Sequence, residues 1–194
     1  MSWDIYFLWY NLIGDYMKIV LVRHAQTEDN FNNIMQGLRN NLLNDTGRRD
    51  SLKLREKLKG INFDYCYTSP LVRCVETAFI LIGDKCEMIK DDRLIERDLG
   101  ELEGKKRDTY DISKYWDYDL NSNDLGVEPV RSVIDRCRDF LEYVKNKYPS
   151  DTNILIVTHS APVKALKLLL ENKELKGNLF ERNIKNSEYL VFDI

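Results

Sequence analysis

The sequence predicts an α/β protein, built as a three-layer α/β/α sandwich around a mostly parallel central sheet. Residues 19–22 and 154–157 consist entirely of Ile, Val and Leu, without alternating polar positions. Such runs are typical of parallel strands that are covered on both faces. Strand-like and amphipathic helical segments alternate along the chain, which favours helices packed on a sheet. A chain of 194 residues is long enough for one core between two helical layers.

The elements of the first part of the chain follow from apolar runs and capping residues. A strand is expected at about 18–23, and residues 25–45, rich in Asn, Gly and Gln, are typical of an extended functional loop. A helix over about 45–59 has an Asp or Thr to cap its start and Gly60 to stop it. A second strand is expected near 65–67.

A second helix is expected to open at Ser69 and Pro70, with Ser as the cap and Pro in the first helical position. It ends at Gly83, and a short strand over 86–89 follows. The apolar positions of this helix predict one buried face, formed by Leu71, Val75, Ala78, Phe79 and Ile82.

The last part of the chain contains the clearest helix. Residues 90–128 are acidic, aromatic and irregular, whereas 129–147 carries apolar residues at helical spacing. A strand over 153–158, a helix over about 162–170 and a final strand over 189–192 complete the expected elements.

Composition excludes several classes of function. The net charge of −3 gives no reason to expect nucleic acid or a membrane as a partner. The four cysteines show no paired spacing, so we expect neither a zinc site nor a disulfide framework but free thiols in a reducing, cytoplasmic location. No G-x-x-x-x-G-K-[ST] motif is present, which excludes a P-loop enzyme.

The amino-terminal segment differs from the rest of the chain in its high content of aromatic residues. Residues 1–16 form an aromatic-rich extension that is too short for a membrane span and lacks a basic segment before it, so we do not expect a signal peptide. It is either a bland extension or an element that packs on the domain or on a second subunit, which makes a homodimer one expectation. Residues 17–194 are expected to form a single domain.

The two histidines of the chain occur in matched settings. His24 and His159 each follow directly on a buried-strand run and one polar residue. Ligand sites of open α/β sheets lie at the carboxyl ends of the strands. We therefore expect both imidazoles at one site, joined there by Arg23 and by Arg73 after the second strand. Two guanidinium groups beside helix N-termini predict a phosphoryl or other anion site, and imidazole is a competent nucleophile toward phosphorus.

At this point the chain resembles a known family, the histidine phosphatase superfamily, which includes cofactor-dependent phosphoglycerate mutase. The resemblance covers nearly the whole chain from Lys18 onward and implies a phosphoglycerate mutase-like fold. It rests on six segments in matching order, namely R-H-A-Q-T-E-D-N (23–30), Gln36-Gly37, Asp45-Thr46-Gly47-Arg48, T-S-P-L-V-R-C-V-E-T-A (68–78), L-I-E-R-D-L-G-E-L-E-G (94–104) and, at the end, I-V-T-H-S-A (156–161).

The resemblance implies a role for each matching residue. His24 is the residue that becomes phosphorylated, Glu96 is the general acid and base, and the remaining catalytic residues surround the phosphoryl group: Arg23, Arg73 and His159. Substrate or phosphate contacts are implied for Thr27, Asn30, Gln36, Gly37, Arg97 and Ser160. No metal or other cofactor is implied, because the site already has its cations.

Two departures from the family pattern do not remove a reacting group. Ala25 replaces the usual Gly, so we expect an ordinary negative φ there, and Ser160-Ala161-Pro162 replaces a common glycine pair. In-line attack needs a neutral His24, whereas His159 is expected to act as a cation. Glu96 must be protonated so that it can give a proton to the leaving alkoxide. These titrations together predict a bell-shaped pH profile.

Hydrolysis of a small phosphorylated metabolite is the expected reaction. A mutase of the family has a longer chain and a carboxyl-terminal tail that shields the site, whereas this sequence ends on the predicted strand. Residues 105–126 carry four aromatic residues and form either a lid that sets substrate choice or a surface loop whose aromatics pack on the domain.

Three alternatives remain open. A mutase would depend on a bisphosphorylated primer, and a non-catalytic domain would bind a phosphorylated ligand or a protein. The third is a calcium loop over 117–128, whose acidic spacing fits, although Ser122 stands where the sharp turn needs Gly.

Overall fold

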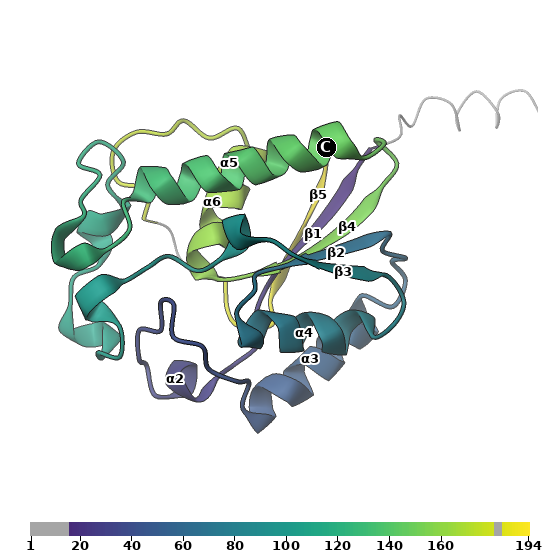
Figure 1. The fold of residues 1–194 in the computed structure, drawn as a ribbon, viewed down its shortest axis with the longest axis horizontal. Helices are drawn as coiled ribbons and strands as arrows, with labels where there is room; N and C mark the ends of the chain where they lie inside the picture. Colours follow the sequence, from purple (N-terminus) through teal and green to yellow (C-terminus); the bar gives the residue numbers. More distant parts are fainter. Residues whose placement is uncertain (1–15, 181–183) are drawn as a thin grey trace, which may run out of the picture.

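The computed structural model, which describes residues 16–180 and 184–194, is built around a five-stranded sheet (Figure 1). The strand order is β3-β2-β4-β1-β5, and every neighbouring pair is parallel except β1 and β5. The strands are β1 (Lys18–Arg23), β2 (Tyr65–Thr68), β3 (Glu87–Lys90), β4 (Asn153–Thr158) and β5 (Tyr189–Asp193).

Helices cover both faces of this sheet, which confirms the predicted three-layer sandwich (Figure 1). One face carries α3 (Asp45–Lys57) and α4 (Val72–Ile82), and the other carries α5 (Val130–Lys147) and α6 (Ser160–Leu170). The remaining helical segments are the short α2 (Glu28–Phe31) and five 3₁₀ turns, η1 (Asp92–Leu94), η2 (Gly100–Leu102), η3 (Arg107–Thr109), η4 (Ser113–Trp116) and η5 (Asp124–Gly126).

The two apolar runs are strands buried on both faces, as predicted. In β1, Ile19 and Leu21 belong to the core under α5 and α6, whereas Val20 and Val22 belong to the core under α3 and α4. Because a strand alternates its side chains between faces, an all-apolar strand is stable only between two helical layers. β1 and β4 are paired along their whole length, so they end side by side.

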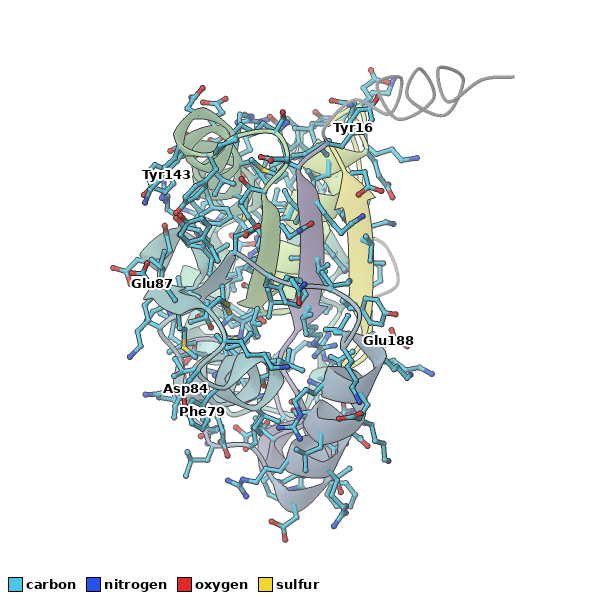
Figure 2. All side chains as sticks on the ribbon, turned by 90° about the vertical axis from the view of Figure 1, so that its right-hand side faces the viewer. Tyr16, Phe79, Asp84, Glu87, Tyr143 and Glu188 are labelled. Atoms are coloured by element: carbon cyan, nitrogen blue, oxygen red, sulfur yellow. The ribbon has the colours of Figure 1, made fainter. Side chains whose placement is uncertain are left out.

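Helix α4 differs from its prediction in both its start and its buried face. Ser69 and Pro70 lie before the helix, which begins at Val72 and has Leu71 at its cap without a side-chain cap. Phe79 is 60% exposed, as the labelled side chain in Figure 2 shows. The buried face instead includes two polar residues, Arg73 and Thr77, which the apolar pattern did not predict. Its members are Arg73, Cys74, Thr77, Ala78, Leu81 and Ile82.

Two other helices also differ from prediction at their ends. Helix α3 ends at Lys57, with Leu58 rather than Gly60 at its C-cap, and its N-cap is Asn44, which accepts a hydrogen bond from the Gly47 backbone. Helix α6 begins at Ser160, two residues before Pro162, and His159 takes the N-cap position. Proline is tolerated throughout the first turn because the N–H groups there have no intrahelical partner.

The aromatic extension predicted over residues 1–16 lies outside the described residues except for Tyr16, so its role stays a prediction. The single domain over 17–194 likewise stays a prediction. Within residues 16–180 and 184–194, no helix is long and apolar enough to cross a membrane.

Candidate active site

The carboxyl ends of β1 and β4 bring the two histidines together. His24 and His159 follow directly after these strands, and their ring centroids lie 5.1 Å apart in an edge-to-face arrangement. The His24 backbone N–H donates to the Thr158 carbonyl at 2.8 Å, which extends the strand pairing into the site. Both side chains are buried, with exposed fractions of 2% and 0%. The prediction that the imidazoles share one site is therefore confirmed in its geometry.

His24 is oriented by its own backbone. Its Nδ1 lies 2.8 Å from the Ala25 carbonyl oxygen, and because a carbonyl only accepts, Nδ1 carries the proton and Nε2 carries the lone pair. Burial lowers the pKa of His24 well below its ordinary value, and the charges of Arg73 and Arg23 lower it further. The ring is neutral, as a nucleophile must be. Ala25 has no positive φ, as expected from its side chain.

Arg73 is a fully buried guanidinium whose three nitrogens are all held. Nη1 donates to the Arg39 carbonyl at 2.6 Å, and Nη2 donates to the Gly37 carbonyl at 2.9 Å. Nε donates to Nδ1 of His159 at 3.1 Å. Each Nη still has one hydrogen outside these bonds, so the group is fixed in place and can still donate to an anion.

Arg23 adds a second, half-buried cation. Its Nη1 donates to the Ile184 carbonyl at 2.8 Å, and its Nε is buried without a hydrogen-bond partner among the described residues. Burial lowers the pKa of Arg23 to about 10, which still leaves the group charged at neutral pH. Neither guanidinium group has an ion-pair partner within 4 Å among the residues that the structure describes, and two such cations, one fully and one half-buried, favour binding of an anion between them.

His159 differs from its expected charge state. Arg73 Nε can only donate, so Nδ1 of His159 is unprotonated and the ring is neutral. Burial lowers the pKa of His159 well below its ordinary value, and neighbouring cations, Arg73 first, lower it further. The contacts of His159 therefore favour a neutral ring, in contrast to the expected cation, and the neighbouring arginines supply positive charge to the site.

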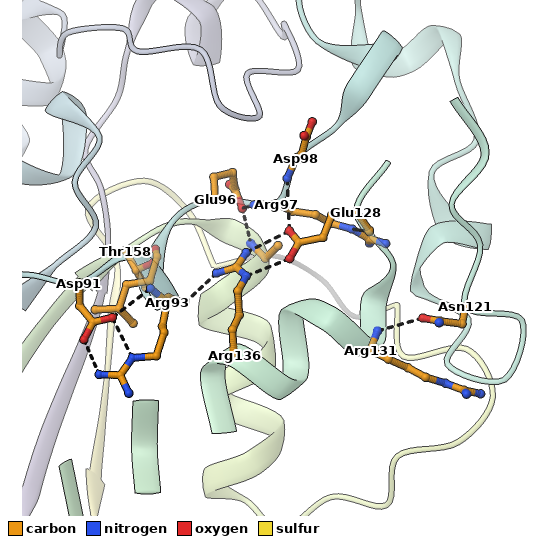
Figure 3. Close-up of polar contacts among 12 residues, drawn as sticks. Asp91, Arg93, Glu96, Arg97, Asp98, Asn121, Glu128, Arg131, Arg136 and Thr158 are labelled. Carbon is orange, nitrogen blue, oxygen red and sulfur yellow. Dashed lines mark hydrogen bonds and ion pairs between the residues drawn. The ribbon is translucent and has the colours of Figure 1, made fainter. Parts of the chain in front are cut away.

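Glu96 reaches the site from the loop after η1 and is held at the start of α6. Its Oε1 accepts from the backbone N–H groups of Arg97 at 2.9 Å (Figure 3) and Ala161 at 3.1 Å. Its Oε2 accepts from the Ser160 N–H at 3.2 Å. These three N–H donors hold the carboxyl group in place beside α6, and its role as the general acid stays a prediction. Ser160 thus contacts Glu96 through its backbone N–H rather than through its hydroxyl.

The loop after β1 holds the predicted substrate contacts in one hydrogen-bonded group. Thr27 caps α2 and accepts from the Asn30 backbone N–H, and its hydroxyl lies 3.0 Å from Gln36 Oε1. Asn30 Oδ1 accepts from Asn186, whose amide also donates to the His24 carbonyl at 2.9 Å. Asn186 was not predicted, since nothing in its local pattern distinguishes it, and only the fold brings it beside His24.

The backbone geometry at position 37 requires glycine, and this requirement can be tested. Its φ is +52°, and an added Cβ would lie 1.9 Å from the Glu103 carboxylate, which accepts from the Leu38 N–H. We expect Gly37→Ala to lower the free energy of unfolding by about 1–3 kcal/mol and to reduce turnover, because the Gly37 carbonyl holds Arg73. Chemical denaturation and initial rates measure both effects. Gly60→Ala is the matched control, since nothing lies within 4 Å there, and equal stability losses in the two variants would contradict this account.

Arg97 is committed mainly to protein groups. Its Nε donates to the Glu128 carbonyl at 2.6 Å, Nη1 donates to the Tyr115 carbonyl at 2.7 Å, and its guanidinium lies over the Trp116 ring. Only Nη2 is buried without a partner among the described residues. Glu128 in turn pairs with Arg136, as Figure 3 shows. Arg97 therefore ties the residue beside Glu96 to the 105–128 segment, and its contact with substrate stays a prediction.

A pocket of about 50 Å³ opens beside Glu96. Its wall is largely apolar, and its lining includes Met35, Leu99, Leu102, Ile112, Tyr115 and Trp116 together with Arg97, Arg107, Ser160 and Ala161. Tyr115 and Trp116 of the 105–126 segment are buried and also line this pocket, and the role of the segment as a lid that sets substrate choice stays a prediction. Arg107 was missed from the sequence, although a basic run follows the Glu96 motif directly.

The acidic positions of the calcium-loop pattern are used within the protein. Asp117 accepts from the backbone of Asp119 and Leu120, and Asn121 accepts from the Arg131 N–H (Figure 3). Among the described residues, no group of three or more His, Cys, Asp or Glu side chains could hold a metal ion.

Comparison with known proteins agrees with this geometry. The family model of the histidine phosphatase superfamily (branch 1) matches residues 19–193. Phosphoserine phosphatase 1 of Hydrogenobacter thermophilus is 31% identical over 90% of this chain and 85% of its own. A 2,3-bisphosphoglycerate-dependent phosphoglycerate mutase of Bradyrhizobium diazoefficiens is 32% identical over 83% and 84%. The structure of Bacillus stearothermophilus YhfR aligns with a TM-score of 0.80 and 26% identity, covering 90% of each chain.

These matches and the paired histidines define a protein of the phosphoglycerate mutase-like fold with a histidine-centred site. The chain belongs to the histidine phosphatase superfamily (branch 1). Its relatives include both phosphatases and mutases, so phosphoryl-transfer chemistry of the phosphatase type is supported and the substrate is not yet named.

Proposed function

We propose that this protein is a metal-independent phosphomonoesterase that hydrolyses a small phosphorylated metabolite through a phosphohistidine on His24. The observation that carries the proposal is the orientation of His24. Its protonated Nδ1 is held by the Ala25 carbonyl, which leaves the Nε2 lone pair available near the guanidinium groups of Arg23 and Arg73.

The proposed reaction has two displacements. In the first, Nε2 of His24 attacks phosphorus, the P–O ester bond breaks, and Glu96 gives a proton to the leaving alkoxide. In the second, a water molecule gives a proton to Glu96 and attacks the phosphohistidine, which releases phosphate. Arg23 and Arg73 stabilise the charge on the phosphoryl oxygens throughout, since phosphoryl transfer depends mostly on positioning and electrostatics.

The proposed substrate is small and carries a group that the pocket beside Glu96 can hold. The apolar wall fits a carbon skeleton, and Arg107 is a cation in the lining of the same pocket. Thr27, Asn30, Gln36 and Gly37 are proposed to contact the phosphoryl group or substrate. We propose neither nucleic acid nor a membrane as partner, and we retain a homodimer and a cytoplasmic location as proposals.

Mutase activity is the second candidate, favoured by the similarity to a phosphoglycerate mutase. Both reactions need the same phosphohistidine, and they differ in whether water or a bound acid accepts the phosphoryl group. The third candidate, a non-catalytic phospholigand-binding domain, is disfavoured because His24, Glu96 and His159 are all present.

Phosphate release from an aryl phosphomonoester in the presence of a chelator tests the proposal. We expect turnover that the chelator does not reduce, followed by preference for one member of a panel that includes phosphoserine and 3-phosphoglycerate. Isomerisation of 3-phosphoglycerate only with added 2,3-bisphosphoglycerate would favour the mutase. Binding of phosphate by a folded protein that turns over no substrate would favour the binding domain.

A further inference from the structure

Ser69 lies at the end of β2, and its hydroxyl contacts the second histidine. Its Oγ is 2.7 Å from Nε2 of His159, and both side chains are fully buried. The same hydroxyl oxygen accepts from the Leu71 backbone N–H at 3.3 Å. The Ser69 backbone N–H donates to the Val157 carbonyl, so the serine is held beside the end of β4.

The contacts of His159 determine which nitrogen carries its proton. Arg73 Nε has one hydrogen and no lone pair, so it can only donate, and Nδ1 of His159 must accept. The single proton of the neutral ring is therefore on Nε2, where Ser69 Oγ accepts it. In the opposite tautomer an Nδ1–H would face the Nε–H of Arg73, and two donors on fully buried side chains would oppose each other.

We propose that Ser69 is a positioning residue that acts through His159: its hydroxyl accepts the Nε2 proton and thereby holds the tautomer whose Nδ1 keeps Arg73 in place. The Gly37 and Arg39 carbonyls hold the other two nitrogens of that guanidinium. Ser69, His159 and Arg73 thus form a chain of hydrogen bonds that ends at a group facing the phosphoryl site. This inference rests on the proposed function only where it concerns turnover.

Other groups around His159 do not replace this contact in the structure. Cys74 Sγ lies 3.3 Å from Nε2, but burial raises the pKa of this thiol far above neutral, so it stays a weak, protonated neighbour. His24, Arg23 and Arg136 also contribute to the electrostatic environment of the ring. None of these three has a hydrogen bond to His159 within the described part of the chain.

The tautomer can be measured without any activity. The chain has two histidines, so nitrogen-labelled histidine gives two ring systems in a long-range nitrogen–proton NMR spectrum, and His24→Ala assigns them. We expect the Nε2–H tautomer for His159 in the wild type. Ser69→Ala should shift the ring toward a mixture with the Nδ1–H form, and Ser69→Thr should restore the wild-type pattern.

The kinetic arm uses the same variants. We expect Ser69→Ala to lower kcat about ten-fold, the value of roughly one lost hydrogen bond to a charged or polarised group, with a smaller change in KM and recovery in Ser69→Thr. Ser51→Ala is the matched control, because Ser51 is also fully buried but bonds the Gly47 carbonyl within α3. Cys74→Ala should leave the tautomer unchanged.

Two results would overturn the proposal. One is an unchanged His159 tautomer in a folded Ser69→Ala protein, and the other is a wild-type ring protonated on Nδ1. A protein that shows the expected tautomers but hydrolyses no phosphomonoester would instead contradict the proposed function and leave the role of Ser69 toward His159 standing.

Discussion

Replacing His24 by Ala is expected to reduce phosphate release to the background rate, a loss of at least about a thousand-fold. No other neutral nitrogen in the site has the same freedom to attack, because both ring nitrogens of His159 are held by Arg73 and Ser69. The loss should appear in kcat, while inorganic phosphate should still bind to the remaining guanidinium groups.

Trapping of the intermediate checks this expectation directly. Wild-type protein quenched during turnover of a radiolabelled phosphomonoester should carry label that is lost in acid and kept in base, as a phosphoramidate bond requires. His24→Ala should carry none, whereas His159→Ala should still become labelled, more slowly. Label on His24→Ala would move the nucleophile to another residue.

The low pKa of His24 gives this nucleophile a defined pH dependence. Its pKa in the folded protein lies well below 6.5, so the ring loses its lone pair to a proton only in more acidic solution. Lowering the pH from about 8 to 6 should therefore not reduce kcat/KM through protonation of His24, in contrast to an exposed histidine, which would be mostly charged at pH 6. A rate that falls in proportion to an ordinary histidine titration would contradict the buried, neutral ring.

Replacing Glu96 by Gln is expected to produce the second largest loss, about 10²–10⁴-fold for substrates with an alkyl leaving group. Such an alkoxide needs a proton as the P–O bond breaks, whereas an activated aryl leaving group departs without one. The loss in the phosphorylation step should therefore be much smaller for an aryl phosphomonoester. Glutamine keeps an oxygen for the backbone donors of α6 but cannot exchange a proton.

A comparison of the two substrate types gives this prediction its control. The difference should be seen in single-turnover rates of phosphorylation at neutral pH. Glu101→Gln, at an exposed residue of η2 five positions along the chain, should leave both rates unchanged. Equal losses for alkyl and aryl substrates would show that Glu96 acts through binding or structure rather than proton transfer.

The fold and the clustering of the main site residues could be predicted because they depend on local patterns. An all-apolar strand such as β1 or β4 requires helices on both faces, and parallel strands place their ends at one edge, where His24 and His159 meet. The start of α4 and its buried face could not be read in the same way. Arg73 is turned inward by carbonyl groups of a distant loop, and that turn leaves Phe79 exposed.

The charge states of the site were decided by the tertiary structure alone. The sequence by itself determined that two imidazoles, two guanidinium groups and a carboxyl group would converge, since each stands at the end of a strand or in a recognisable motif. Whether His159 is neutral or charged depends on how deeply the ring is buried and on Arg73 approaching Nδ1. The position of the Glu96 carboxyl group likewise depends on the backbone N–H groups at the start of α6, which donate to its oxygens. Desolvation and hydrogen-bond direction are properties of the packed site, and no local pattern encodes them.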